Sequence, residues 1–157
     1  MRTVPLSRVF ISDEIKQKVI EAIDSGQYIL GPSCTAFEKE LAAFVDTAHG
    51  VGVNSGSDAL TLALRALDIG PEDEVITTPF TYIAPSESIH QVGARIVYAD
   101  IDPRHFTIDA ADVARRITPR TKAILPVHLF GQAAPLDALL PLAERHGLKV
   151  VEDCAQS

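Results

Sequence analysis

Short apolar runs alternate with helical segments through the second half of the chain, and this alternation limits the fold more than any other feature. Four runs have the composition of buried strands: residues 74–78, 95–99, 122–127 and 149–153. Helices are predicted between them, at residues 86–92, 109–117 and 136–146. We expect Pro141 to break or restart the last of these helices. Strands joined by helices favour a largely parallel sheet covered by helices, so the sequence predicts an α/β fold.

The first half of the chain predicts mainly helices. Ser12 is suited to cap a helix that ends near Gly26. A second helix is expected to begin at residues 35–38, where Thr-Ala-Phe-Glu fits a capping box. Residues 50–53 predict a short strand, and residues 57–67 predict a helix with leucines along one face.

Composition narrows the classes of partner. The 157 residues are enough for one domain with a core, and 14 basic against 21 acidic side chains give a net charge of −7. Such a chain is a poor candidate for binding nucleic acid or an anionic membrane surface. Cys34 and Cys154 form no CxxC pair, and no apolar run is long enough to span a bilayer, so we expect a cytoplasmic protein with free thiols. The five histidines lack the spacing of a metal site.

The segment NSGSDAL, residues 54–60, joins an expected strand to an expected helix. Gly56 would let the backbone approach a ligand closely. Ser57 and the amides of Asp58 and Ala59 would lie at the helix N-terminus, where a phosphate is stabilised. The alternative is an ordinary capped turn that binds nothing.

The segment TTPFTYIAPSES, residues 77–88, follows an expected strand and carries Phe80 and Tyr82. Ligands of open α/β sheets bind beyond the carboxyl ends of the strands, so an aromatic side chain here is placed to lie against a ring-shaped ligand. The alternative is that both aromatic side chains pack in the core.

The segment VVEDCAQS, residues 150–157, places Asp153 at the end of an apolar run. A carboxylate in such a place needs a cation or N–H partner, and no Arg or Lys lies nearby in sequence, which leaves room for a cationic ligand. Alternatively, Glu152 and Asp153 reach solvent or cap a following helix.

In order and spacing, these segments together resemble the DegT/DnrJ/StrS family of pyridoxal-phosphate-dependent sugar aminotransferases. The resemblance covers nearly the whole chain and is carried by VPLSRVFISDEI, ILGPSCTAFEKELAAF, VGVNSGSDALTLALRAL, DEVITTPFTYIA, DIDP, PVHLFGQ and VEDCAQS. It implies the fold-type-I transferase architecture, with a mostly parallel sheet in a large domain and a smaller C-terminal domain. This chain would then be one partial domain, with an N-terminal arm at about residues 1–34, a cofactor-binding α/β part at about residues 35–157, and no small domain.

The resemblance also assigns one ligand, pyridoxal 5'-phosphate, to the three segments. It implies that Gly56, Ser57 and Asp58 hold the phosphate, and that Tyr82 and Ala155 lie on the two faces of the ring. By the same resemblance, Asp153 pairs with the protonated ring nitrogen and Gln156 bonds the phenolic oxygen. Family members transfer an amino group, usually from glutamate, to a keto-sugar attached to a nucleotide, and they are homodimers.

The lysine that performs this chemistry in the family is expected beyond Ser157. The lysines of this chain, at residues 16, 18, 39, 122 and 149, match other family positions. The chain alone is therefore expected to lack transaminase activity, and its sheet to have uncovered apolar faces. Two alternatives remain open. One is a relative with histidine in place of the lysine, which dehydrates a deoxysugar. The other is a non-catalytic protein that binds a phosphate ligand or a partner subunit.

Overall fold

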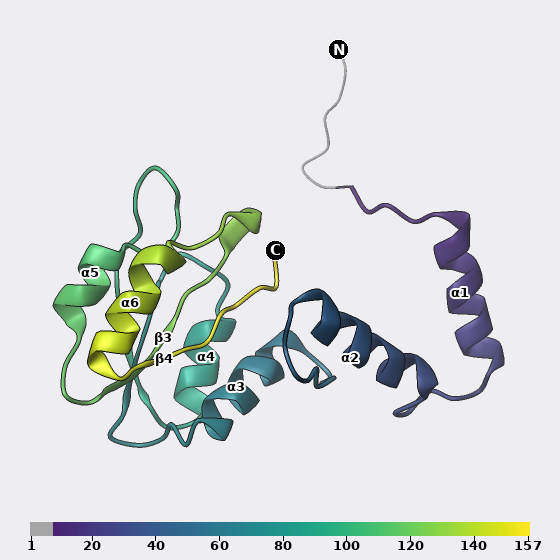
Figure 1. The fold of residues 1–157 in the computed structure, drawn as a ribbon, viewed down its shortest axis with the longest axis horizontal. Helices are drawn as coiled ribbons and strands as arrows, with labels where there is room; N and C mark the ends of the chain where they lie inside the picture. The colour runs from purple at the N-terminus through teal and green to yellow at the C-terminus, as the bar shows by residue number, and fades with distance from the viewer. Residues whose placement is uncertain (1–7) are drawn as a thin grey trace, which may run out of the picture. The chain divides into compact units, whose positions relative to one another are not determined.

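The computed structural model describes residues 8–157, which form two compact units. The first unit ends at Gly52, and the second runs from Val53 to Ser157. Figure 1 shows the elements of each unit. Residues 8–157 contain no helix that is both long and apolar enough to cross a membrane.

Within residues 8–52, the first unit holds two helices, α1 (Asp13–Asp24) and α2 (Pro32–Phe44). The Ser12 hydroxyl accepts a hydrogen bond from the Ile15 N–H at 3.2 Å, which confirms the predicted cap of α1. The start predicted for α2 is wrong, because the helix begins three residues earlier, with Gly31 as N-cap and Pro32 as its first residue. Proline is well suited to that position, since its missing N–H would have no helical partner there.

The strand predicted at residues 50–53 is absent, and those residues pair with no described strand. The segment instead lies against α2, where the Glu38 carboxylate accepts the Gly52 N–H at 2.7 Å. A β-carbon at Gly50 would come within 2.5 Å of the Glu38 carbonyl oxygen, so the close approach requires glycine.

The second unit contains a parallel sheet with helices on both faces. Its strands are β1 (Glu74–Thr77), β2 (Arg95–Tyr98), β3 (Thr121–Leu125) and β4 (Lys149–Val150), in the order β2-β1-β3-β4. Its helices are α3 (Gly56–Ala66), α4 (Ala84–Gln91), α5 (Ala110–Arg116) and α6 (Leu136–His146), with a short 3-10 turn, η1 (Leu129–Gly131). All pairs are parallel, and the predicted α/β class is confirmed.

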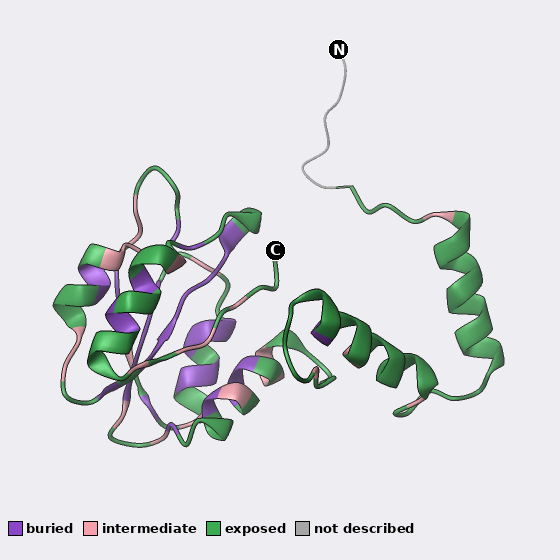
Figure 2. Cartoon of the chain, in the orientation of Figure 1, coloured by how far each residue is buried: buried purple, intermediate pink, exposed green. Residues whose placement is uncertain are grey.

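Successive residues of the central strands face opposite sides of the sheet. Val75 and Leu125 belong to a core cluster with leucines of α3, and Ile76 and Ile124 to another with residues of α5 and α6. Figure 2 shows this buried interior along the strands. Every residue of β1 is buried, so the expectation of uncovered apolar faces is wrong for the centre of the sheet.

The helix α6 continues through Pro141, contrary to the predicted break. Proline cannot donate to the carbonyl of Asp137, one turn earlier. Both residues lie on the exposed side of the helix, where that carbonyl is open to solvent and needs no protein donor. Leu139 and Leu142 face the core and keep the helix packed on the sheet.

Candidate functional site

The carboxyl ends of the four parallel strands lie along one edge of the sheet, which we call the carboxyl edge. The loop at residues 78–83 follows β1 there, His128 follows β3, and Asp153 follows β4. An isolated parallel bridge between Val127 and Asp153 continues the β3–β4 pairing beyond the regular strands. This edge is where ligands of open α/β sheets bind.

The N-terminus of α3 is capped by Ser55, a residue that the sequence analysis did not single out. Its hydroxyl oxygen accepts the Asp58 N–H at 3.1 Å, and its hydroxyl donates to the Asp58 carboxylate at 2.9 Å. The Ser55 carbonyl accepts the Ala59 N–H at 3.0 Å. The Ser-x-x-Asp spacing of Ser55 and Asp58 was the signal that would have identified the cap.

At this helix end, the backbone N–H groups of Gly56 and Ser57 have no acceptor among residues 8–157. A β-carbon added at Gly56 would meet no neighbouring atom within 4 Å, so no other part of the described chain packs against this residue. The Ser57 carbonyl accepts the hydroxyls of Thr61 at 3.1 Å and Ser88 at 3.2 Å, which fixes the first turn of α3 to α4.

Both aromatic side chains of the 78–83 loop are accessible, so the core-packing alternative is wrong. The exposed fraction is 72% for Tyr82 and 45% for Phe80. Phe106 belongs to the loop that follows β2, and the centroid of its ring lies 6.0 Å from that of Phe80. Tyr82 has no such aromatic neighbour among residues 8–157 and presents its ring to solvent.

Asp153 is half-buried and lacks a cationic partner within the described residues. Its backbone is held on both sides, because its N–H donates to the Pro126 carbonyl at 2.9 Å and its carbonyl accepts the His128 N–H at 3.1 Å. One carboxylate oxygen accepts the Ala155 N–H at 3.0 Å. The carboxylate caps a turn, and its second oxygen is free for a ligand.

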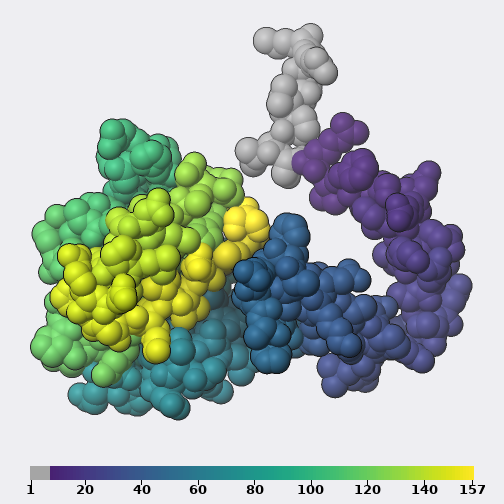
Figure 3. All heavy atoms as spheres, in the orientation of Figure 1, coloured from purple at the N-terminus to yellow at the C-terminus, as the bar shows by residue number. Residues whose placement is uncertain are grey.

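The last residues of the chain fold over η1. The Gln156 side-chain carbonyl accepts the Phe130 N–H at 2.7 Å, which turns the Gln156 amide nitrogen away as a free donor. Phe130 has a φ of 57°, in the left-handed region. Ala155 and Gln156 are both exposed, and Figure 3 shows this segment in yellow at the surface of the second unit.

His128 is a buried titratable residue of this edge, and the spacing of the five histidines gave no sign of a role for it. Its side chain is 6% exposed. Its Nδ1 accepts the Ala134 N–H at 3.0 Å, so the ring proton is on Nε2, which donates to the Glu152 carboxylate at 2.9 Å.

His128, Glu152 and Cys154 have potential metal ligands within 4.8 Å of one another. Neither nitrogen of His128 keeps a free lone pair, however, because one accepts and the other donates a hydrogen bond. Partial burial also raises the pKa of the Cys154 thiol, and the carboxylates of Glu152 and Asp153 raise it further. A protonated thiol is a weak ligand, so the trio is a poor metal site.

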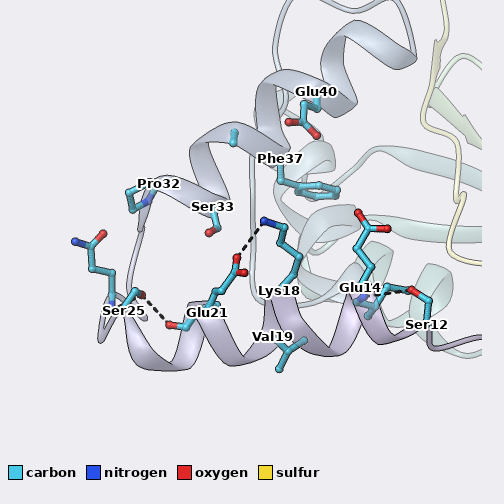
Figure 4. A pocket seen from close by; sticks show the side chains of 14 residues that line it. Ser12, Glu14, Lys18, Val19, Glu21, Ser25, Pro32, Ser33, Phe37 and Glu40 are labelled. Carbon is cyan, nitrogen blue, oxygen red and sulfur yellow. Dashed lines mark hydrogen bonds and ion pairs between the residues drawn. The ribbon is translucent and has the colours of Figure 1, made fainter.

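An open groove of about 1030 Å³ lies in the first unit, between α1 and α2. Phe37 of α2 and Glu14 and Lys18 of α1 point into it (Figure 4). Lys18 is bonded to Glu21 at 3.0 Å beside it. None of the residues predicted to contact the cofactor lines this groove.

A model of the DegT/DnrJ/EryC1/StrS aminotransferase family matches residues 10–157. The chain belongs to this family. The UDP-N-acetyl-3-dehydro-alpha-D-glucosamine 3-aminotransferase of Acidithiobacillus ferrooxidans is 49% identical over 147 residues, which are 94% of this chain and 40% of that protein.

Solved aminotransferases of the family share the fold. DesV from Streptomyces venezuelae is 51% identical, with a TM-score of 0.87 over 92% of this chain and 39% of that one. NtdA from Bacillus subtilis, solved with bound cofactor PMP, is 34% identical, with a TM-score of 0.87 over 94% of this chain and 35% of that one. The family and fold class that the motifs predicted are therefore confirmed. The chain spans about 40% of the length of the curated relatives it matches.

Proposed function

We propose that this chain provides the cofactor-binding edge of a pyridoxal-phosphate-dependent aminotransferase that acts on a nucleotide-linked keto-sugar. One observation carries the proposal: a half-buried carboxylate, Asp153, follows β4 at the carboxyl edge, and no residue among 8–157 supplies a cation beside it. A protonated pyridine nitrogen is the partner that this carboxylate lacks.

The donor groups at the α3 N-terminus suit a phosphate. The N–H groups of Gly56 and Ser57 belong to the first turn of α3, where free N–H groups and the helix dipole favour an anion, and the Ser57 hydroxyl is a further potential donor. The Asp58 N–H already bonds Ser55, so a phosphate would share it with the cap. The Asp58 N–H is therefore proposed as the weakest of the three phosphate contacts, after those of Gly56 and Ser57.

The groups around Asp153 suit the pyridine ring. The free amide nitrogen of Gln156 is a donor for the phenolic oxygen, and Tyr82 and Ala155 supply accessible surface for the two ring faces. Pyridoxal phosphate, when bound, supplies an electron sink for reactions at an amino carbon. The Asp153 carboxylate keeps a proton on the ring nitrogen, because a neighbouring negative charge favours the charged form.

We propose a nucleotide-linked keto-sugar as substrate and glutamate as amino donor. Support comes from the relative in Acidithiobacillus ferrooxidans, whose name specifies a UDP-linked dehydro sugar. In the proposed enzyme a homodimer forms the working unit. The lysine that binds the cofactor covalently in the family is proposed to come from sequence that follows this segment, so the 157 residues alone should bind the cofactor without turnover.

Titration of the purified 157-residue chain with pyridoxal phosphate tests the proposal, with circular dichroism to verify that the chain is folded. We expect saturable binding, followed by absorbance, and binding of pyridoxal, which lacks the phosphate and all of its contacts, that is weaker by about 100-fold or more. A folded chain that fails to bind pyridoxal phosphate would contradict the proposed function. Consumption of glutamate by the chain alone would contradict only the expected inactivity.

A further inference from the structure

We propose that His128 is a positioning residue for the cofactor ring. Its imidazole, in one fixed tautomer, holds both of the segments that carry the residues in contact with that ring. One segment follows β4 and contains Asp153, and the other is the turn at residues 129–134, whose Phe130 amide orients Gln156. The inference rests on the proposed function and deepens it, because it concerns the same site.

The backbone of His128 connects to both segments. Its N–H donates to the Asp153 carbonyl at 3.1 Å, and its carbonyl accepts the Gly131 N–H at 3.2 Å. His128 therefore lies at the junction where the strand pairing ends and the turn begins.

The Nδ1 atom of the imidazole closes the turn. It accepts the N–H of Ala134, a residue that is only 4% exposed. A buried N–H left without an acceptor is strongly unfavourable, so this bond selects the tautomer with a bare Nδ1. Phe130 lies inside the closed turn with its φ of 57°, a conformation that non-glycine residues adopt only when their surroundings hold them.

The Nε2–H of the same ring fixes the segment that follows β4. It donates to Glu152, the residue before Asp153, and the acceptor is charged, which shortens and strengthens the bond. Glu152 is itself 41% exposed, so the buried ring provides the rigid end of the pair. One imidazole thus restrains Asp153 through Glu152 and Gln156 through the turn.

The two bonds can be separated by substitution. In His128→Asn, the side-chain oxygen lies near the position of Nδ1 and retains the Ala134 bond, while the Glu152 bond is lost. In His128→Gln, the side-chain nitrogen lies near the position of Nε2 and retains the Glu152 bond, while the Ala134 bond is lost. His146→Gln on α6 is the matched control, because His146 is exposed and takes part in neither segment.

Three readouts on the 157-residue chain distinguish positioning from simple packing: the Kd for pyridoxal phosphate, the ¹⁵N shift of its labelled ring nitrogen, and the rate of hydrogen exchange at the Phe130 amide. We expect His128→Asn to raise the Kd about tenfold and to move the shift toward the unprotonated ring. We expect His128→Gln to speed hydrogen exchange at the Phe130 amide with the ring nitrogen still protonated. The control should match wild type in every readout.

Glu152 gives a second test that avoids changing the buried ring. Glu152→Ala should raise the Kd as His128→Asn does, and Glu152→Gln, which keeps an oxygen acceptor, should restore it. If wild type binds and His128→Asn and Glu152→Ala both keep its Kd and ring shift, the positioning role is wrong, whatever the melting temperatures. If folded wild type fails to bind, the proposed function fails and this inference fails with it.

Discussion

Glu74 and Asp153 are carboxylates at opposite ends of the parallel strands of one sheet. They differ in burial, in their hydrogen-bond partners and in whether a cation lies beside them. Glu74 begins β1 where the amino ends of the strands lie together, which we call the amino edge, and its side chain is 3% exposed. It accepts bonds from the Thr118 hydroxyl at 2.5 Å and from Arg120 at 2.8 and 3.2 Å. Asp153 accepts one local N–H and has no cationic partner among residues 8–157.

This contrast separates a structural carboxylate from one available to a ligand. Thr118 and then Arg120, both bonded to the Glu74 carboxylate, hold the pKa of Glu74 below its ordinary value of 4.5. That carboxylate has no remaining need for a partner, whereas Asp153 keeps one oxygen free beside the exposed Gln156. Substitutions at the amino edge should therefore change stability, and substitutions at the carboxyl edge should change ligand binding.

The largest effect is expected at Asp153. Asp153→Asn removes the negative charge that favours a protonated pyridine, and charge pairs of this kind shift a pKa by about two units. Binding of pyridoxal phosphate to the protonated form should therefore weaken about 100-fold, measured as the Kd by absorbance titration. The unfolding free energy should change little.

Asp100→Asn is the matched control, because Asp100 follows β2 at the same edge and its side chain bonds only the adjacent Ile101 N–H. Equal losses of affinity in the two variants would mean that overall charge governs binding, and the comparison between Glu74 and Asp153 would collapse.

The next effect is on stability at the amino edge. Glu74→Gln replaces a buried carboxylate that accepts charge-assisted bonds, and the unfolding free energy should fall by roughly 2 kcal/mol in urea denaturation. The Kd for pyridoxal phosphate should stay at the wild-type value. Glu72→Gln, at an exposed position two residues earlier, should leave both quantities unchanged.

The same substitution should change the acid stability. The folded pKa of Glu74 is lower than the unfolded one, so its stabilisation is complete above pH 4.5 and is lost as the pH falls through the folded value. Asp112 contributes in the same direction, because the Asp100 N–H and Arg116 lower its pKa. The difference between the wild-type and Glu74→Gln curves isolates Glu74, and it should narrow below pH 4.5. A constant difference down to low pH would show that Glu74 is not stabilised as a carboxylate.

Ser57 offers an intermediate effect at the carboxyl edge. Ser57→Ala removes one hydroxyl contact to a phosphate and should weaken binding of pyridoxal phosphate about tenfold, without weakening pyridoxal. Thr118→Val is the counterpart at the amino edge and should lower stability while leaving the Kd unchanged. If Ser57→Ala weakens both ligands equally, the phosphate does not lie at the α3 N-terminus.

The elements that the sequence predicted well are those decided by local pattern. The run at residues 74–78 became β1 because its residues are buried on both faces, and Ser12 caps α1 through a bond that spans three residues. The start of α2 was mispredicted because two local signals competed, and Pro32 prevailed over the capping box at residues 35–38.

The contacts that the sequence could not predict join distant residues. Arg120 and Glu74 are 46 positions apart, and His128 and Glu152 are 24 apart. Sheet order brings these side chains together, and no local pattern encodes that order. For the same reason, residues 50–53 were read as a strand from their composition, although strand formation depends on a neighbouring strand that the described residues do not provide.

The smallest effect on the unfolding free energy is expected at Arg95, and it tests whether Glu74 is stabilised by hydrogen bonds or by nearby positive charge. Its guanidinium lies 3.7 Å from the Glu74 carboxylate without a hydrogen bond, and its side chain is 71% exposed. An ion pair so open to water is worth little, so Arg95→Ala should change the unfolding free energy by less than about 0.5 kcal/mol. Arg120→Ala removes two hydrogen bonds to the same carboxylate and should cost clearly more in the same urea titration. Equal losses of unfolding free energy in the two variants would mean that positive charge near Glu74, and not hydrogen-bond geometry, stabilises this edge. Added salt would then reduce both losses together, because salt screens charges that act at a distance.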